Sequence, residues 1–174
     1  MKFNLLDKIE QLSDDRIVAV KHVSLAEEYL ADHFPTFPVL PGVMMLEALI
    51  QAAGWLLHRR RGFACSMAVL KEARNVKYGT FVAPGNYLRV EVEWAKDTAV
   101  GAAFKAAGTV GGSGAPVDDP TAVQARIEIA YFNLADKQAA LAEVDRRLRE
   151  HHQQRWALIA PTMIERAMPT TMAI

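Results

Sequence analysis

Cysteine is nearly absent from this sequence, and so is any excess of charge. Cys65 is the single cysteine among 174 residues, which excludes an intramolecular disulfide and fits a reducing compartment. Lys plus Arg number 20, as do Asp plus Glu, so the formal net charge is zero. Such a balance gives no global indication of binding to nucleic acid or to an anionic membrane. No cluster of Cys and His has metal-ligand spacing, so we expect no metal.

Long hydrophobic runs are missing as well. Residues 1–15 mix charge with leucine too evenly for a signal peptide. The most apolar segment, 43–57, is too short for a membrane span and contains Glu47 and Gln51. We therefore expect a cytoplasmic protein without a membrane span, built as one main domain.

The segment 33–60 joins a proline-rich loop to an apolar stretch. Prolines at every third position exclude a helix in residues 33–41. Residues 42–60 contain no breaker except Gly54, end in cations and precede another glycine, so they predict one helix. This helix is apolar nearly all round, which indicates that protein encloses it.

The rest of the chain predicts short strands around this helix. Alternating or apolar runs predict strands at 16–23, 65–78, 87–95, 99–110 and 122–133. Helical spacing predicts a short amphipathic helix at 3–12, and residues 26–31 predict one or two helical turns. Residues 111–120 predict a flexible connection. Without a βαβ rhythm, this pattern indicates an α+β domain in which an antiparallel sheet wraps the long helix.

The C-terminal part differs in composition from the rest. We expect residues 1–135 to form the domain, and 136–174 to form a helical extension and a tail. Residues 136–156 predict a charged helix whose apolar stripe consists of Leu141, Val144 and Leu148. The basic residues of this helix could bind a partner or simply face solvent.

Three groups in segment 33–60 could carry acid–base chemistry. His33 can take or give a proton near neutral pH. Glu47, a carboxyl inside an apolar helix, can be held protonated and act as an acid. The N–H groups of Gly42 and Val43 lie free at the positive helix end, where they could stabilise an oxyanion. Such groups could remove a proton next to a carbonyl and expel a β-hydroxyl, but Glu47 could instead pair with an arginine or line a subunit interface.

The order of residues here resembles the signature of the β-hydroxyacyl-acyl-carrier-protein dehydratases of fatty acid synthesis. The shared pattern is His33-Phe34-Pro35-x-x-Pro38-Val39-x-Pro41-Gly42-Val43-x-x-Leu46-Glu47-Ala48-x-x-Gln51. The resemblance extends over residues 15–133, including a second turn at 82–86. It implies the hotdog fold, a long helix wrapped by an antiparallel sheet. Relatives that also isomerise the double bond carry Asp at the acid position, so Glu47 favours a simple dehydratase.

The resemblance also implies roles for individual residues. His33 would be the catalytic histidine, Glu47 the acid and the Gly42 amide the oxyanion donor, with Gln51 orienting Glu47. Each site of a homodimer would combine His33 of one subunit with Glu47 of the other, and dimers could assemble further. Implied substrate contacts are Phe34, Phe37, Pro41, Val43, Met44 and Gln51. Met45 and Trp55 are either further tunnel walls or plain core residues.

The implied substrate is a (3R)-3-hydroxyacyl thioester on the phosphopantetheine arm of acyl carrier protein or of coenzyme A, with no other cofactor. Candidate contacts to an acidic carrier protein are Arg59, Arg60, Arg61, Arg74 and Lys77.

The chain departs from the family at several positions. Asp32 and Thr36 stand where the family has glycine, and residues 79–81 replace its basic residues before the second turn. Two alternatives remain: a hotdog thioesterase, and a non-catalytic acyl-carrier or lipid-binding subunit.

Overall fold

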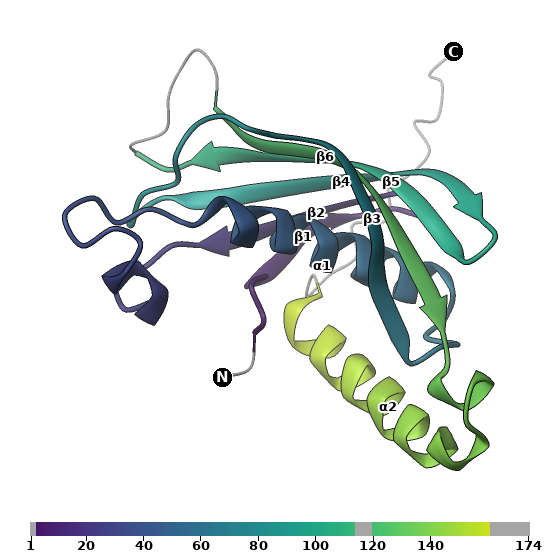
Figure 1. Cartoon of the computed structure of the whole chain (residues 1–174). Helices are drawn as coiled ribbons and strands as arrows, with labels where there is room; N and C mark the ends of the chain where they lie inside the picture. Colours follow the sequence, from purple (N-terminus) through teal and green to yellow (C-terminus); the bar gives the residue numbers. More distant parts are fainter. Residues whose placement is uncertain (1–2, 114–119, 161–174) are drawn as a thin grey trace, which may run out of the picture.

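A six-stranded antiparallel sheet wraps a central helix in the computed structural model, which describes residues 3–113 and 120–160 (Figure 1). The strands are β1 (Lys8–Leu12), β2 (Arg16–His22), β3 (Met67–Tyr78), β4 (Tyr87–Thr98), β5 (Gly101–Gly111) and β6 (Thr121–Phe132). Their order in the sheet is β1-β2-β4-β5-β6-β3, so β3 forms one edge. The predicted α+β architecture is confirmed.

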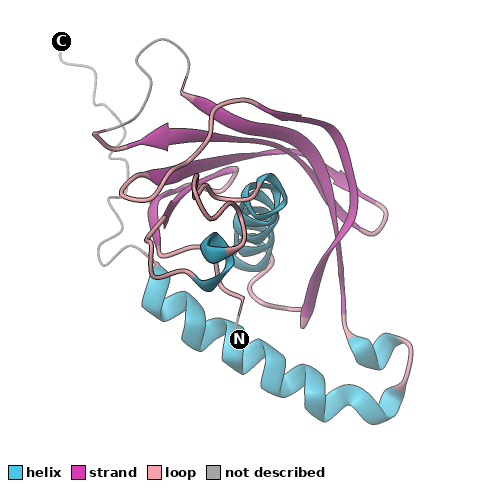
Figure 2. Ribbon diagram, turned by 60° about the vertical axis from the view of Figure 1, so that its left-hand side comes forward, coloured by secondary structure: helices cyan, strands magenta, loops and turns pink. Residues whose placement is uncertain are grey.

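The central helix α1 spans Gly42–Arg60, the range that the sequence predicts. The sheet curves around it, as the end-on view in Figure 2 shows. Small side chains allow this close approach. On the helix, Ala48, Ala52 and Ala53 are fully buried, and in the sheet the register places Ala106 opposite Val92 and Ala125. The short side chains let helix and sheet approach closely.

The amphipathic helix predicted at 3–12 is wrong. Residues 8–12 form β1, which pairs with β2 through a register that shifts between Ile9 and Gln11. This irregularity is a β-bulge, which inserts one extra residue into the strand. Ile9 and Leu12 therefore turn toward the same side although they are three residues apart, and a bulged strand imitates helical spacing. The turn predicted at 26–31 is confirmed as a short 3₁₀ helix, η1 (Glu28–Ala31).

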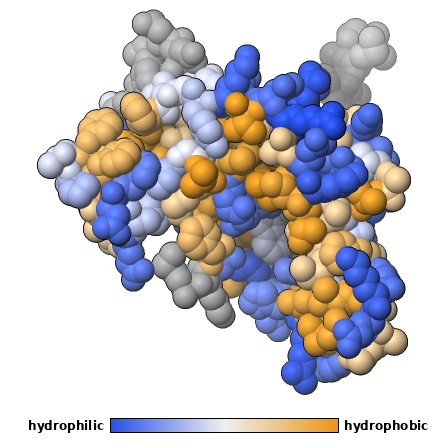
Figure 3. All heavy atoms as spheres, in the orientation of Figure 1, coloured by the Kyte–Doolittle hydropathy of each residue, from blue (hydrophilic) through white to orange (hydrophobic). Residues whose placement is uncertain are grey.

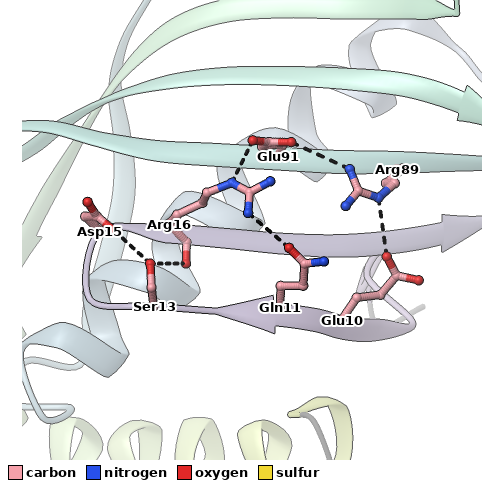
Figure 4. A network of polar contacts seen from close by, with 7 residues as sticks. All are labelled: Glu10, Gln11, Ser13, Asp15, Arg16, Arg89 and Glu91. Carbon is pink, nitrogen blue, oxygen red and sulfur yellow. Dashed lines mark hydrogen bonds and ion pairs between the residues drawn. The ribbon is translucent and has the colours of Figure 1, made fainter. Parts of the chain in front are cut away.

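A polar network ties β1 to β2 and β4 on the outer face of the sheet (Figure 4). Arg16 donates from Nε to Glu91 at 2.7 Å and from Nη1 to Gln11 at 3.0 Å. The register places Val18 opposite both Gln11 and Glu91, and Val18 is fully buried. The charged side chains thus cover apolar surface while their own groups stay paired. The network also includes Glu10, Ser13, Asp15 and Arg89.

A second helix, α2 (Ala142–Ile159), crosses the side of α1 that the sheet leaves open (Figure 2). It follows two short 3₁₀ turns, η2 (Leu134–Asp136) and η3 (Ala139–Leu141), so it begins later than predicted. The predicted apolar stripe is only partly confirmed: Leu141, which lies in η3, and Leu148 are half-buried, but Val144 is 41% exposed, whereas Asp145 and Ile159 are buried. The inward face carries polar and aromatic residues that bond to the domain, and hydropathy alone cannot identify such a face.

Some predictions fall outside the described residues. Most of the flexible connection predicted at 111–120 lies outside them, and the tail after residue 160 lies outside them as well. Of the helices in the described part of the chain, none combines the length and apolarity that crossing a membrane requires.

Candidate active site

His33 lies in a short loop between η1 and α1. Its backbone N–H donates to the Tyr29 carbonyl at 3.1 Å, and its peptide bond to Phe34 is cis. Ring atom Nδ1 lies 3.1 Å from the Val39 carbonyl oxygen. Because a carbonyl can only accept, Nδ1 must carry the hydrogen, and in the neutral ring Nε2 keeps its lone pair. The loop therefore holds His33 in the tautomer that presents Nε2 as a base.

The loop itself is closed by backbone hydrogen bonds. Phe34 and Phe37 exchange two of them, at 3.2 and 2.9 Å, and the Val39 N–H donates to the His33 carbonyl at 3.2 Å. The Leu40 N–H donates to the Val82 carbonyl at 2.9 Å, which ties the loop to the turn at residues 82–86. Such closure restricts how far the His33 ring can move.

The first turn of α1 supplies backbone donors. The Pro41 carbonyl accepts from the N–H groups of Met44 and Met45, at 2.9 and 3.1 Å. Among the described residues, no backbone carbonyl accepts from the N–H of Gly42 or Val43. These groups lie at the positive end of the helix, where an anionic oxygen is favoured.

Glu47 lies one turn further along α1 and is partly buried. Gln51 donates from Nε2 to Glu47 Oε1 at 2.9 Å, a contact that the spacing of four residues anticipates. Gln51 also contacts the backbone of the N-terminal segment: the Leu5 N–H donates to Oε1 at 2.9 Å, and Nε2 donates to the Phe3 carbonyl at 3.1 Å. Sequence spacing gives no signal for these last two contacts.

Within one chain, in the part that the structure describes, no hydrogen bond or ion pair joins His33 and Glu47. His33 contacts Val39 and the Phe34 ring, whose centroid lies 4.3 Å away. A site shared by two subunits therefore stays a prediction.

The residues expected to contact substrate divide into two groups. Phe34, Phe37 and Val43 are exposed, and Phe37 meets Phe81 edge-on at 5.6 Å. Figure 3 shows apolar surface over the loop that precedes α1, at the left of the molecule. Buried counterparts in the same region are Pro41, Met44 and Met45. Trp55 instead packs against α2, 6.0 Å from His152 and 5.9 Å from Trp156 between ring centroids.

Most of the expected carrier-contacting cations have intramolecular partners. Arg60 lies over the Trp94 ring at 4.3 Å, and Arg61 pairs with Asp97. Arg74 pairs with Glu72 at 2.7 Å. Arg59 and Lys77 make no such contact within residues 3–113 and 120–160.

A second polar cluster joins α1, β6 and α2, and sequence reasoning missed it because its members are far apart in the chain. His58 is only 4% exposed, and Tyr131 lies 3.3 Å from its Nδ1. His152 Nε2 lies 3.0 Å from the Ser66 carbonyl. Burial lowers the pKa of His58 to about 3, and the nearby His152 adds to this effect; burial also lowers the pKa of His152.

Asp145 anchors the start of α2. It accepts a hydrogen bond from the Ser66 hydroxyl and others from the backbone N–H groups of Leu134 and Ala135, at 2.9 and 2.8 Å. Burial opposes ionisation, but these donors outweigh it and lower the pKa of Asp145. No group of three or more His, Cys, Asp or Glu residues in the described ranges is arranged to hold a metal ion.

Residues 1–116 match the family model described as a FabA-like domain. The 3-hydroxyacyl-(acyl-carrier-protein) dehydratase FabZ of Solibacter usitatus (strain Ellin6076) is 40% identical over 111 residues, which cover 63% of this chain and 68% of the relative. The enzyme of the same name from Lactococcus lactis subsp. cremoris (strain SK11) is 37% identical over 110 residues, covering 63% and 76%.

Solved structures agree on the fold. The dehydratase heterocomplex ApeI:P from Xenorhabdus doucetiae has a TM-score of 0.55 at 22% identity, covering 75% of this chain and 99% of its own. A hypothetical thioesterase with coenzyme A from Streptococcus pneumoniae TIGR4 has a TM-score of 0.51 at 13% identity, covering 71% and 84%. At such identities the likeness concerns the fold alone, and the predicted hotdog fold is confirmed. Helix α2 lies outside the matched family domain.

Proposed function

The chain belongs to the FabA-like family, and on this premise we propose that it is a dehydratase of fatty acid or related lipid synthesis. Its substrate is a (3R)-3-hydroxyacyl thioester, and its product is the trans-2-enoyl thioester. The observation that carries the proposal is the contact between His33 Nδ1 and the Val39 carbonyl, because it leaves Nε2 free to act as a base.

Each proposed group performs one part of the reaction. His33 Nε2 takes the proton from the carbon next to the thioester carbonyl. Negative charge then develops on the thioester oxygen, which the Gly42 N–H stabilises at the positive end of α1. Glu47 gives its proton to the 3-hydroxyl as the C–O bond breaks, so that water leaves and the double bond forms. The acyl chain is carried on acyl carrier protein or on coenzyme A, and the lone cysteine agrees with the reducing cytoplasm as the location.

We infer further that two copies of the chain complete each site, His33 coming from one and Glu47 from the other. Three observations support this. In the described part of the chain no hydrogen bond or ion pair joins the two residues, β3 is an edge strand that pairs there with β6 alone, and apolar side chains are exposed around the start of α1. The exposed side chains are Phe34, Phe37, Val43 and Phe81. An uncovered edge and an apolar patch together favour a protein partner.

A hydration assay tests the proposed reaction in reverse. Adding water to a trans-2-enoyl thioester removes its conjugated absorbance without releasing thiol, and we expect this with the carrier-protein substrate, the coenzyme A substrate or both. Thiol release that depends on Glu47, with conjugation unchanged, would indicate a thioesterase. Inertness toward both substrates, in a folded preparation, would favour the non-catalytic alternative.

A further inference from the structure

The N-terminal residues 3–6 lie across α1 beside Glu47. They form no helix or strand, yet Leu5 and Leu6 are only 4% and 2% exposed, so their side chains anchor the segment in the core. The anchoring places two backbone groups opposite Gln51: the N–H of Leu5 and the carbonyl of Phe3. The residues that meet here are 46 and 48 positions apart in the sequence.

These backbone groups determine how the Gln51 amide is oriented. The Leu5 N–H can only donate, so the atom that receives it must be Oε1. Nε2 then faces the other way, and its two hydrogens are used by the Phe3 carbonyl at 3.1 Å and by Glu47 Oε1 at 2.9 Å. Flipping the amide would place a donor against the Leu5 N–H and an acceptor against the Phe3 carbonyl. Such a flip would lose both contacts with the segment.

The fixed amide has a consequence for Glu47. Oε1 always receives a hydrogen from Gln51, so the proton of the neutral acid is directed to Oε2, the oxygen that Gln51 does not contact. We propose that residues 3–6 act as a positioning element of the active site: by locking Gln51, they assign the transferable proton of Glu47 to Oε2. This inference rests on the proposed dehydratase function. Gln51 is a positioning residue here, since it acts through Glu47.

Substitution of Gln51 tests the kinetic consequence. In Gln51→Leu, the carboxyl can rotate, and we expect kcat to fall on the order of tenfold to a hundredfold with KM changed much less. Gln51→Glu keeps an acceptor for the Leu5 N–H but, as a carboxylate, offers no hydrogen to Glu47, and should lower kcat in the same way. Gln153→Leu, on the exposed side of α2, is the matched control and should change neither quantity.

Leu5→Pro tests the segment without altering Gln51. It removes the N–H that holds Oε1, so it should reproduce the loss of kcat with KM changed much less. Combined with Gln51→Leu, it should add little, because both changes break one chain of contacts. A folded Leu5→Pro variant with the wild-type kcat would overturn the proposal.

A spectroscopic arm is independent of turnover and does not depend on the folding of Leu5→Pro. In ¹⁵N-glutamine-labelled protein, the two side-chain amide protons of Gln51 should exchange slowly with water and have chemical shifts that differ from those of exposed glutamines and that change in Leu5→Pro and in Glu47→Gln. A Gln51 amide with the chemical shifts and the water exchange of an exposed glutamine would overturn the proposal, even with dehydratase activity intact. If the Gln51 amide shows the expected shifts and slow exchange but the wild-type protein turns over no thioester, the proposed function fails. The orientation of Gln51 by residues 3–6 would still stand.

Discussion

The ring of Tyr78 lies directly against Gly42, at the start of α1. A Cβ atom at residue 42 would be 3.1 Å from the nearest ring carbon, which is tighter than ordinary van der Waals contact. Tyr78 is half exposed, so its ring can yield, but only by moving away from the helix end that carries the proposed oxyanion donor.

Gly42→Ala should therefore impair catalysis more than stability. We expect the melting temperature to change by a few degrees at most, while kcat falls because the Gly42 N–H and the ring above it are displaced. Tyr78→Ala removes the obstruction, and the double variant Gly42→Ala/Tyr78→Ala should recover part of the lost kcat. Equal losses in single and double variants would show that the ring is not the cause.

Removal of either proposed acid–base group should leave the fold intact and reduce turnover steeply. His33→Ala and Glu47→Gln should each lower kcat by ~10²–10⁴-fold, the usual contribution of such groups. The double variant should be little worse than the poorer single variant, because both groups serve one transition state. Steady-state hydration kinetics measure the effect, and circular dichroism checks the fold.

Mixing the two inactive variants tests whether the site is shared. In a heterodimer of His33→Ala and Glu47→Gln chains, one site loses both groups and the other keeps both. We expect activity to return to about one quarter of the wild-type value after unfolding and refolding a 1:1 mixture, since half of the dimers are mixed and each has one intact site. A mixture that stays inactive would place both groups in one chain or exclude their proposed roles.

Acid should destabilise the packing of α2 against α1. In the folded chain, burial lowers the pKa of His58 to about 3, whereas an unfolded histidine titrates at about 6.5. Between these values the unfolded state binds more protons, so the free energy of unfolding falls as pH decreases, by up to ~1.4 kcal/mol per pH unit for one group. The pKa of His152 is lowered by burial as well, which adds to the slope.

Denaturant titrations at pH 7, 6, 5 and 4 measure this dependence. His58→Leu should flatten the slope, although it will also lower stability at pH 7 because Tyr131 loses a partner. His22→Ala is the control, since that side chain is 66% exposed. An unchanged slope in His58→Leu would mean that other groups govern the acid response.

The sequence by itself determined the central helix and the proline-rich loop that precedes it. Prolines at every third position and an unbroken apolar run are local properties, and they predict α1 at residues 42–60 without any knowledge of its neighbours. Alternating burial along strands such as β4 and β5 is equally local, so the antiparallel sheet was predictable too. The same ordered pattern predicts His33, Glu47 and Gln51 as site residues, and their roles stay a prediction.

The tertiary structure decided what those residues contact. Residues 3–12 have helical spacing, but a bulge and the open edge of β2 make β1 a strand, and pairing energy outweighs the weak local preference. The inward face of α2 is defined by hydrogen bonds to Ser66 and by tilted and edge-on ring contacts with Trp55, contacts that no hydropathy pattern encodes. Gln51 meets Leu5 only because the core buries the N-terminal segment against α1. Such contacts depend on chain segments that are far apart in sequence, and only the folded chain brings them within hydrogen-bonding distance.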